Sequence, residues 1–367
     1  MVSYSDVLAS NESLAAASGG SGPVAVVVGG TNGIGLTTVQ ALLKHTAKPT
    51  IYLVGRSADQ LAKLIDETLQ PLNKAAELIP IVAGDLTLVR NAQRAADEIV
   101  RRITSKSTPG SGSGSNSASA SSPHIDLLIM TPGYLNMSSQ PDWSPEGLER
   151  LMAIRFHARM AILMKLLPLL RRAPSPRVVT LLAGGQEGEL KLDDLGMTAT
   201  KPKTYGPLYA MGAAASMTSL FLEKLATADQ EQNSNIVFIH AFPGLTPDTG
   251  LQIHKSVLFN FIYSVVKVLA GWFGKTHTAQ EAGERTLFAA TSGRFRRLQP
   301  RDADAAVGTL LQPGSDGGLA SGVFLVGEDS DAVPDGGNAE LKKLRARDAA
   351  SRVYDYTLAE LERIEKS

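Results

Sequence analysis

The chain has 367 residues, with 36 basic and 36 acidic side chains, six histidines and no cysteine. Zero formal net charge argues against a nucleic-acid-binding protein, which needs a basic surface to neutralise phosphates. The lack of cysteine excludes disulfides, thiolate nucleophiles and Cys-ligated zinc. The histidines are scattered from His45 to His277 without metal-ligand spacing, so we expect no metal site.

The first 22 residues contain no Lys or Arg. They therefore lack the positive segment of a secretory signal and the Arg-rich pattern of a mitochondrial presequence. The stretch from Ser18 to Gly22 is rich in Gly and Ser. We expect a flexible tail over residues 1–22 and a cytoplasmic protein.

Strand-like and helix-like segments alternate along the rest of the chain. Short β-branched runs predict strands at 23–29, 50–54, 78–83, 125–130, 177–182, 235–242 and 322–326. The intervening segments predict helices at 34–44, 57–69, 88–103, 145–170, 208–226, 256–272, 278–291 and 339–364. This alternation predicts an α/β fold of Rossmann type, a doubly wound parallel sheet covered on both faces, in one domain over 23–330.

Three segments stand out from this alternation. Residues 105–123 are almost wholly Ser, Gly, Ala, Thr and Pro, which predicts a disordered insertion within the domain. The longest apolar run, residues 257–273, is shorter than the ~20 residues of a membrane span. We expect it to belong to a helical lid over 251–291 beside a substrate pocket, with weak membrane-surface contact as the alternative. Residues 331–367 form an expected C-terminal helical extension.

A glycine-rich turn follows the first predicted strand and opens the first helix. Glycines permit a tight turn and let a phosphate approach the backbone, and a helix N-terminus supplies N–H donors and a positive dipole end. We therefore predict that this turn binds the pyrophosphate of a dinucleotide, with a plain strand–helix turn as the alternative. The residues concerned are Gly29, Thr31, Asn32, Gly33, Ile34 and Gly35.

The residues after the second and third strands bear on which dinucleotide binds. An acid at the end of the second strand would bind the free 2′-hydroxyl of NAD, whereas Arg56 suits a 2′-phosphate. The sequence therefore predicts NADP(H), with a solvated loop charge as the alternative for Arg56. Asp85 is placed to meet the adenine edge, with a helix N-cap as the alternative.

These motifs make the chain similar to the short-chain dehydrogenase/reductase family over roughly residues 23–330. The resemblance is carried by Gly29, Gly33 and Gly35, by Asp85-Leu86, and by Pro243-Gly244 after the sixth strand. It implies hydride transfer between ketone and alcohol, cofactor contacts from Pro243 and Gly244, and a homodimer paired through the helices after the fourth and fifth strands. The segment at 182–188 is similar to the corresponding segment in divergent family members from fungal secondary-metabolite gene clusters.

The expected catalytic residues depart from the family pattern. The family's Ser falls at Ala183, its structural Asn at Arg155, and no lysine lies four residues after Tyr205 or Tyr209. Such a lysine would lower the pKa of the phenol from ~10. We expect Tyr205, with Tyr209 as a second candidate, to contribute the phenol, and Arg155 to orient a carbonyl or anionic oxygen. The alternative for Arg155 is an ion-paired or surface arginine.

Other polar residues are candidates to replace the missing lysine and serine. Lys201 and Lys203 could restore the missing charge, and Gln186 and Glu187 could replace the missing serine. In each case the alternative is ordinary loop polarity.

The sequence thus predicts an NADP(H)-dependent oxidoreductase with an atypical active site, acting on a lipophilic small molecule in secondary-metabolite biosynthesis. The apolar side chains of the expected lid favour a bulky apolar ligand. Loss of the usual catalytic residues leaves two alternatives, a non-redox cyclase or isomerase and a non-catalytic dinucleotide-binding protein.

Overall fold

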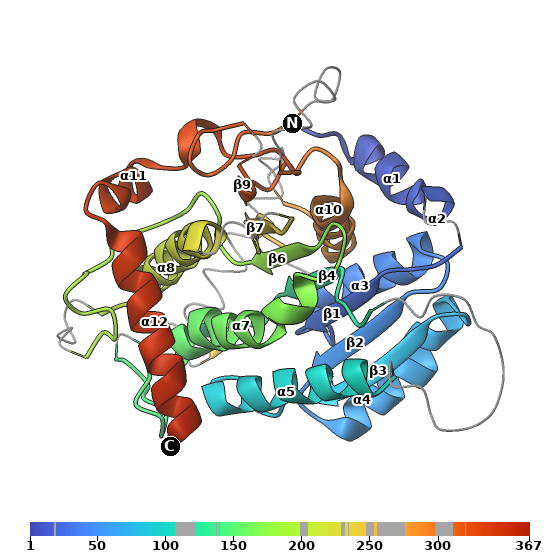
Figure 1. Ribbon diagram of the computed structural model, residues 1–367, viewed down its shortest axis with the longest axis horizontal. Helices are drawn as coiled ribbons and strands as arrows, with labels where there is room; N and C mark the ends of the chain where they lie inside the picture. Colours follow the sequence, from blue (N-terminus) through green and yellow to red (C-terminus); the bar gives the residue numbers. More distant parts are fainter. Residues whose placement is uncertain are drawn as a thin grey trace.

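A computed structural model of the protein describes residues 1–17, 20–106, 122–136, 138, 140–198, 205–228, 232–233, 235–246, 253–254, 276–297, 311–319 and 321–367. A parallel seven-stranded sheet with the order β3-β2-β1-β4-β6-β7-β9 forms its centre (Figure 1). The chain winds outward in both directions from the neighbouring strands β1 and β4. This order confirms the predicted Rossmann-type fold, whose ligand site lies at the carboxyl edge near that switch point.

Most of the strands are short, apolar and buried on both faces, as parallel strands covered by helices must be, whereas the edge strand β3 exposes Glu77 and Val82. In β1, Val26 and Val28 pack on one face of the sheet, and Ala25 and Val27 pack on the other. The bounds of the strands are β1 (Val24–Val28), β2 (Thr50–Gly55), β3 (Glu77–Val82), β4 (Leu127–Met130), β6 (Arg177–Leu181), β7 (Val237–Ala241) and β9 (Val323–Val326).

Helices cover both faces of this sheet (Figure 1). One layer contains α3 (Gly33–His45), α4 (Ala58–Leu64) and α10 (Ala279–Thr291), and the other contains α5 (Val89–Lys106), α7 (Ala158–Leu170) and α8 (Pro207–Ala228). Among the described helices, none has both the length and the apolar character needed to cross a bilayer. The predicted insertion at 105–123 lies almost wholly outside the described residues.

Helix α10 packs directly against α3. The Thr37 hydroxyl donates to the carbonyl of Ala279 at 2.7 Å, and a Cβ on Gly283 would overlap Thr37. Residues 279–291, which the sequence placed in a lid, therefore belong to the helical layer on the sheet. Most of the remaining lid range, 255–275, lies outside the described residues, so the lid and its membrane contact stay predictions.

Two helices occupy the N-terminal region for which the sequence predicted a flexible tail, α1 (Tyr4–Glu12) and α2 (Leu14–Ala17). Val2 and Val7 are buried, and Asn11 donates through Nδ2 to the Glu284 carboxylate of α10 at 2.7 Å. The same carboxylate lies 3.1 Å from His45 Nε2 at the end of α3. This buried polar cluster, which no local pattern shows, attaches the N-terminal segment to the domain.

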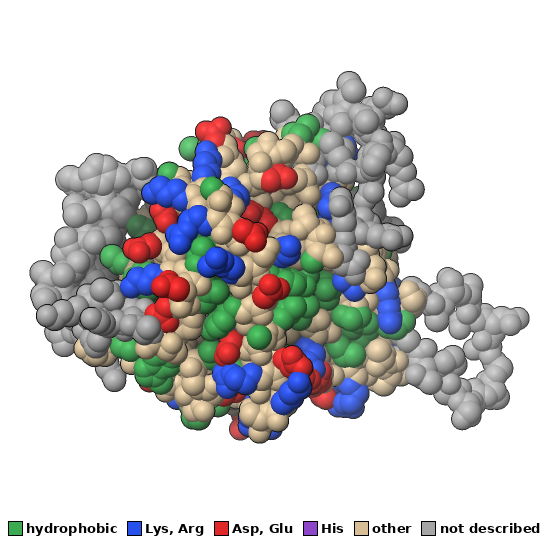
Figure 2. Space-filling model, turned by 60° about the vertical axis from the view of Figure 1, so that its left-hand side comes forward, with side chains coloured by type: hydrophobic (Ala, Val, Ile, Leu, Met, Phe, Trp, Pro, Cys, Tyr) green, Lys and Arg blue, Asp and Glu red, His purple; other side chains and the backbone are tan. Residues whose placement is uncertain are grey.

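The C-terminal segment forms α11 (Ala339–Arg345) and α12 (Ala349–Lys366), separated by Asp348 in the left-handed region with φ of +52°. Helix α12 packs against α8 and α5, with Tyr354 stacked on Phe221 at 5.2 Å between ring centroids. Figure 2 shows this side of the molecule, over which acidic and basic side chains are interspersed. Helix α12 therefore covers part of the helical surface through which the family resemblance implied pairing.

Candidate active site

The glycine turn joins β1 to α3 at the carboxyl edge of the sheet. Gly29 has φ of +85°, which favours glycine, and its N–H donates to the carbonyl of Val54 at 3.3 Å. A Cβ on Gly35 would overlap the Gly29 carbonyl oxygen, so the turn closes only with glycine there. Asn32 caps α3 by accepting from Gly33 N at 2.8 Å. The turn therefore presents bare backbone and a helix N-terminus at this edge, an arrangement that fits a pyrophosphate.

The loop after β4 braces this turn. The Thr131 hydroxyl lies 3.2 Å from the carbonyls of both Val28 and Gly29, and Thr131 N donates to Val28 at 2.9 Å. These bonds hold the loop at 131–133 against the turn. The backbone at the ends of β1 and β4 is thus fixed where a cofactor would cross the sheet.

Arg56 and Asp85 lie beside the turn, at the ends of β2 and β3. Arg56 is exposed directly after β2. Asp85 accepts from Thr87 N at 2.9 Å and from the Thr87 hydroxyl at 2.8 Å, which shapes the loop before α5. Glu146 caps the first amides of α5 instead, at 2.6 Å from Val89 N. Asp85 is therefore not the N-cap of α5, and its carboxylate stays exposed at this edge.

Pro243 and Gly244 follow β7 at the same edge. Gly244 has φ of +74°, and a Cβ there would meet Glu328. The next residue, Leu245, pairs with Thr276 in an isolated bridge. A small parallel ladder between β5 (Leu135–Asn136) and β8 (Ile253–His254) joins the loop after β4 to the segment after β7.

The loop after β6 lies flush on α8. Gly188 N donates to Gly212 O at 3.1 Å, and a Cβ on either glycine would overlap the other residue's backbone. Ser216 on the same helix donates to Gly188 O at 2.6 Å. Ala213, where the family resemblance expects a lysine after Tyr209, has no exposed surface. The Ala213 side chain is thus fully enclosed by its neighbours.

Tyr205 and Arg155 lie near each other in a buried polar cluster. Arg155 lies in a π-helical turn, η3 (Ala153–His157), that joins α6 (Arg150–Met152) to α7, and such turns are frequent at functional sites. Its Nη2 donates to Tyr134 O at 2.8 Å. Tyr205 is 5% exposed, and its charged or titratable neighbours are Glu149, Arg155 and Tyr134. Burial, then the charge of Glu149, raises the pKa of Tyr205, so the phenol is protonated at neutral pH.

Tyr209 has a different set of neighbours. Lys191 Nζ lies 5.3 Å from the centroid of its ring, and the loop after β6 also brings Glu189 and Asp194 near it. Burial is the main cause that raises the pKa of Tyr209. The structure thus joins Tyr205 to Arg155 and separates Tyr209 from them. Glu149 and Lys191 were missed by the sequence analysis, since no spacing links either to a tyrosine; Lys201 and Lys203 lie outside the described residues.

Fungal oxidoreductases are similar to this chain along most of its length. No family model matches the chain. The oxidoreductase andH of Emericella variicolor is 31% identical over 350 residues, which cover 92% of this chain and 90% of that protein. The short-chain dehydrogenase/reductase SAT2 of Stachybotrys chartarum is 26% identical over 352 residues, covering 95% and 94%. This chain belongs to the short-chain dehydrogenase/reductase family of oxidoreductases.

Solved structures share the fold of this short-chain dehydrogenase/reductase. L-sorbose reductase from Gluconobacter frateurii, complexed with NADPH and L-sorbose, has a TM-score of 0.51 at 18% identity, covering 74% of this chain and 91% of that one. An NADPH-bound short chain oxidoreductase from Pseudomonas aeruginosa with an atypical catalytic center has a TM-score of 0.50 at 18% identity, covering 74% and 90%. At such identities the likeness shows the fold alone.

In this short-chain dehydrogenase/reductase a buried hydrogen-bond chain lies behind Ala183. Ala183 N donates to His240 Nε2 at 3.1 Å, which assigns the imidazole proton to Nδ1. That Nδ1–H faces the Ser219 hydroxyl at 2.8 Å, and Ser219 donates to Glu187 Oε1 at 2.7 Å. Glu187 is therefore held in the interior, not at the mouth of a site, whereas Gln186 is exposed. Ser219 is no nucleophile, because the imidazole atom that faces it, Nδ1, already carries a proton and cannot accept one from the serine.

A second buried arginine, Arg159, ties the strand ends together. Its Nη1 donates to the Thr180 hydroxyl at 2.6 Å, Leu181 O at 2.7 Å and Met130 O at 3.1 Å, and Nη2 donates to Pro132 O at 2.6 Å. Burial lowers the pKa of this guanidinium to about 9. The family's structural Asn was expected at Arg155, and Arg159, one helical turn later, reaches the ends of β4 and β6.

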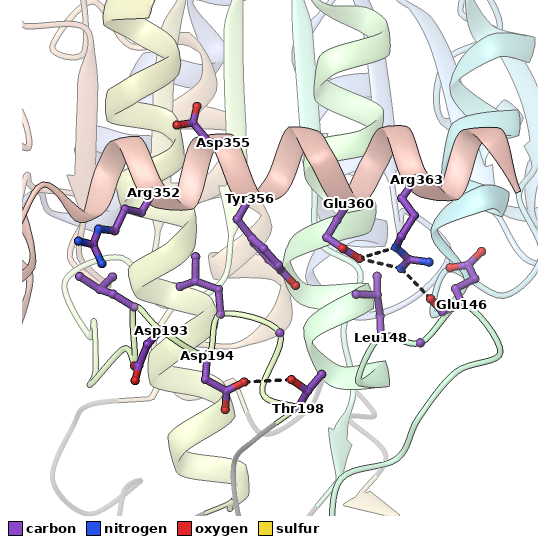
Figure 3. A pocket seen from close by; sticks show the side chains of 14 residues that line it. Glu146, Leu148, Asp193, Asp194, Thr198, Arg352, Asp355, Tyr356, Glu360 and Arg363 are labelled. Carbon is purple, nitrogen blue, oxygen red and sulfur yellow. Dashed lines mark hydrogen bonds and ion pairs between the residues drawn. The ribbon is translucent and has the colours of Figure 1, made fainter.

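A cavity of about 730 Å³ opens between α12 and the loops at 146–148 and 192–198 (Figure 3). Tyr356 projects from α12 toward these loops, and Arg363 pairs with Glu360 at 2.7 Å and donates to Glu146 O at 2.8 Å. Leu148 in its wall directly precedes Glu149. Within the described ranges, no group of three His, Asp or Glu residues is arranged to hold a metal ion.

Acid should destabilise the protein through His157, which is 1% exposed and packs edge-on against Tyr356 at 5.9 Å between centroids. Burial lowers the pKa of His157 to about 4, against an ordinary value of 6.5. Between these values the unfolded chain binds a proton that the folded protein does not. The free energy of unfolding therefore falls by about 1.4 kcal/mol per pH unit from this residue as the pH drops through that window.

We expect His157→Gln to reduce the slope of the unfolding free energy against pH by about 1.4 kcal/mol per pH unit. Urea unfolding between about pH 6 and about pH 4.5, within the range between the two pKa values of His157, measures this slope. His240, whose pKa burial lowers to about 3, keeps a slope of the same sign in the variant, and Glu187, whose pKa burial raises, opposes it. Equal slopes for His157→Gln and wild type would contradict this assignment.

Proposed function

We propose that this protein is an NADP(H)-dependent reductase that converts a ketone of a lipophilic small molecule to an alcohol in secondary-metabolite biosynthesis. The observation that carries the proposal is the glycine turn closed by Gly29 and Gly35 at the N-terminus of α3. The substrate class comes from the family resemblance and from the apolar run at 257–273. Fungal relatives named as oxidoreductases support the reaction class.

The residues at the carboxyl edge fit NADP(H). The turn and the start of α3 would hold the pyrophosphate, with Thr31, Asn32 and Ile34 beside it. The exposed Arg56 would bind the 2′-phosphate, and Asp85 the adenine edge. Pro243 and Gly244 lie at the same edge after β7. NADPH in the G. frateurii and P. aeruginosa enzymes of the same fold supports this choice.

The bound cofactor would supply the hydride, and Tyr205 the proton. During reduction the carbonyl carbon gains hydride, and its oxygen takes the phenolic proton as the C=O double bond becomes a single bond. The pKa of Tyr205 is raised mainly by burial, so the phenol enters the reaction protonated and suits reduction better than oxidation. Arg155 would stabilise the phenolate left behind until water returns the proton, in place of the family's lysine.

The proposal is tested by titrating the protein with NADPH and NADH while following nicotinamide fluorescence. We expect NADPH to bind more tightly, and Arg56→Ala to weaken NADPH about tenfold or more without changing NADH, because charge-assisted hydrogen bonds to the 2′-phosphate are lost. Arg172→Ala, an exposed arginine after α7, is the matched control. Equal NADPH affinity in wild type and Arg56→Ala would reject Arg56 as the phosphate ligand.

The same assay separates the alternatives. Addition of candidate ketones with loss of absorbance from NADPH supports the reductase. Product formed without consumption of NADPH supports a cyclase or isomerase, which the buried Ala183 and Ala213 favour because the family's Ser and Lys are missing. Binding of NADPH without any product supports a dinucleotide-binding protein. A homodimer stays a prediction and would need a surface other than the part of α8 that α12 covers.

A further inference from the structure

Asp85, the residue expected at the adenine edge, is held in part by a side chain from a distant element. Thr87 N donates to Asp85 Oδ1 at 2.9 Å, and the Thr87 hydroxyl donates to Asp85 Oδ2 at 2.8 Å. Arg150, the first residue of α6, donates through Nη1 to the same hydroxyl at 2.7 Å, and this Nη1 lies 3.7 Å from Asp85 Oδ2. These contacts join the loop after β3 to α6, across 63 residues of sequence.

The direction of each hydrogen bond in this chain of contacts follows from its chemistry. A guanidinium has only N–H groups, so it donates and never accepts. The Thr87 hydroxyl therefore accepts from Arg150 and directs its single proton to Asp85 Oδ2. Each oxygen of the Asp85 carboxylate thus receives a hydrogen bond from Thr87. A carboxylate has about four acceptor positions, so acceptor capacity is left on both oxygens for a ligand.

Arg150 is itself fixed by the short loop that precedes it. Its N–H donates to Asp142 O at 2.8 Å, and its Nε lies 3.5 Å from Asp142 Oδ1. An isolated antiparallel bridge between Trp143 and Glu149 closes the same loop. The Arg150 side chain is 26% exposed and the Asp85 side chain 57% exposed. A more buried arginine thus supports a carboxylate that stays accessible to a ligand.

An accessible carboxylate held in one orientation suits recognition of an amino group. The exocyclic amino group of adenine is such a donor. We propose that Arg150 is a positioning residue for the cofactor, which through Thr87 fixes the Asp85 carboxylate in the orientation that accepts from the adenine amino group. The inference rests on the proposed function, since it takes NADP(H) to bind with its adenine beside Asp85. The positive charge of Arg150 also reduces repulsion between Asp85 and the cofactor phosphates.

The preference for adenine over hypoxanthine tests the inference. Deamino-NADPH carries hypoxanthine, in which a carbonyl oxygen replaces the amino group and would face the carboxylate as a second acceptor. The affinities of NADPH and deamino-NADPH are compared by titration while nicotinamide fluorescence is followed. We expect the wild-type protein to bind NADPH about tenfold more tightly than deamino-NADPH, as a hydrogen bond to a charged group provides.

Variants along the contact separate positioning from a general structural role, because a loss of structure weakens both nucleotides equally and leaves their ratio unchanged. Arg150→Met should reduce the preference for NADPH to about twofold, because the orientation of Asp85 is no longer fixed. Thr87→Val removes only the hydroxyl and should have a similar effect. The double variant should lose no more than either single variant, since both act through one hydroxyl.

Two further variants serve as rescue and control. Thr87→Ser keeps the hydroxyl and should keep the wild-type preference for NADPH. Arg172→Met, at an exposed site after α7, should keep it as well. Thermal melts show whether each variant is folded. If Arg150→Met does not fold, Thr87→Val and Thr87→Ser, which change no charge, still test the contact.

Failure of this inference differs from failure of the cofactor assignment. If wild type binds NADPH without preference for adenine, or if the folded variants Arg150→Met and Thr87→Val keep the wild-type preference, the inference is overturned and the cofactor assignment stands. If NADPH does not bind to wild type, both fall. If the preference is lost as expected but no ketone is reduced, the inference stands and the reductase proposal falls.

Discussion

NADPH affinity should fall about 100-fold when Gly35 is replaced by Ala, because the pyrophosphate loses hydrogen bonds from backbone amides, and each bond to a charged group contributes about tenfold or more. The added Cβ would overlap the Gly29 carbonyl oxygen, which is backbone and cannot move aside alone. The turn must open, and the amides at the start of α3 then lose their place against the pyrophosphate. Fluorescence titration of NADPH measures the loss.

A matched control for this substitution lies directly after α10. Gly293 is exposed, and a Cβ there would meet nothing within 4 Å. Gly293→Ala should therefore bind NADPH like wild type. If Gly35→Ala, shown by its melting curve to be folded, kept the wild-type affinity, the turn would not be the pyrophosphate site and the assignment of a dinucleotide cofactor would lose its basis.

Replacement of Arg159 by Met should have the largest effect on stability. The side chain fills a similar volume, but four acceptors at the ends of β4 and β6 lose their donor. Each unmet buried acceptor costs roughly 1–3 kcal/mol, so we expect the free energy of unfolding to fall by about 3 kcal/mol or more. Urea unfolding should show a lower midpoint with an unchanged slope.

Removal of the Arg159 charge also has an opposing, stabilising effect. Burial lowers the pKa of Arg159 to about 9, so removal of the charge relieves a desolvation cost. We expect the four hydrogen bonds to outweigh it. Arg159→Lys keeps a charge but not the fork that reaches both strands, and should also be destabilised. Arg172→Met, at an exposed site, should not be. A variant Arg159→Met as stable as wild type would show that the burial cost dominates.

Short sequence patterns predicted most of the fold. The seven strands were predicted because buried parallel strands are short β-branched runs, and the glycine turn because its conformation is set by residues next to each other. The N-terminal helices were not predicted, since what holds α1 in place is a contact between Asn11 and Glu284, 273 residues apart. Such a contact leaves no trace in a local pattern.

The candidate site divides in the same way. The sequence by itself placed Gly29, Gly35, Arg56 and Asp85 at the ends of the first three strands, and these residues share the edge at which we propose that the cofactor binds, because the carboxyl ends of parallel strands lie together. It also predicted that Ala183 and Ala213 stand where the family has Ser and Lys. Only the tertiary structure decided that Tyr205 meets Arg155 and Glu149, and that Arg159 joins two strands. In both cases the side chains come from separate elements. They lie close together because the helices pack on the sheet, and spacing along the chain does not show such contacts.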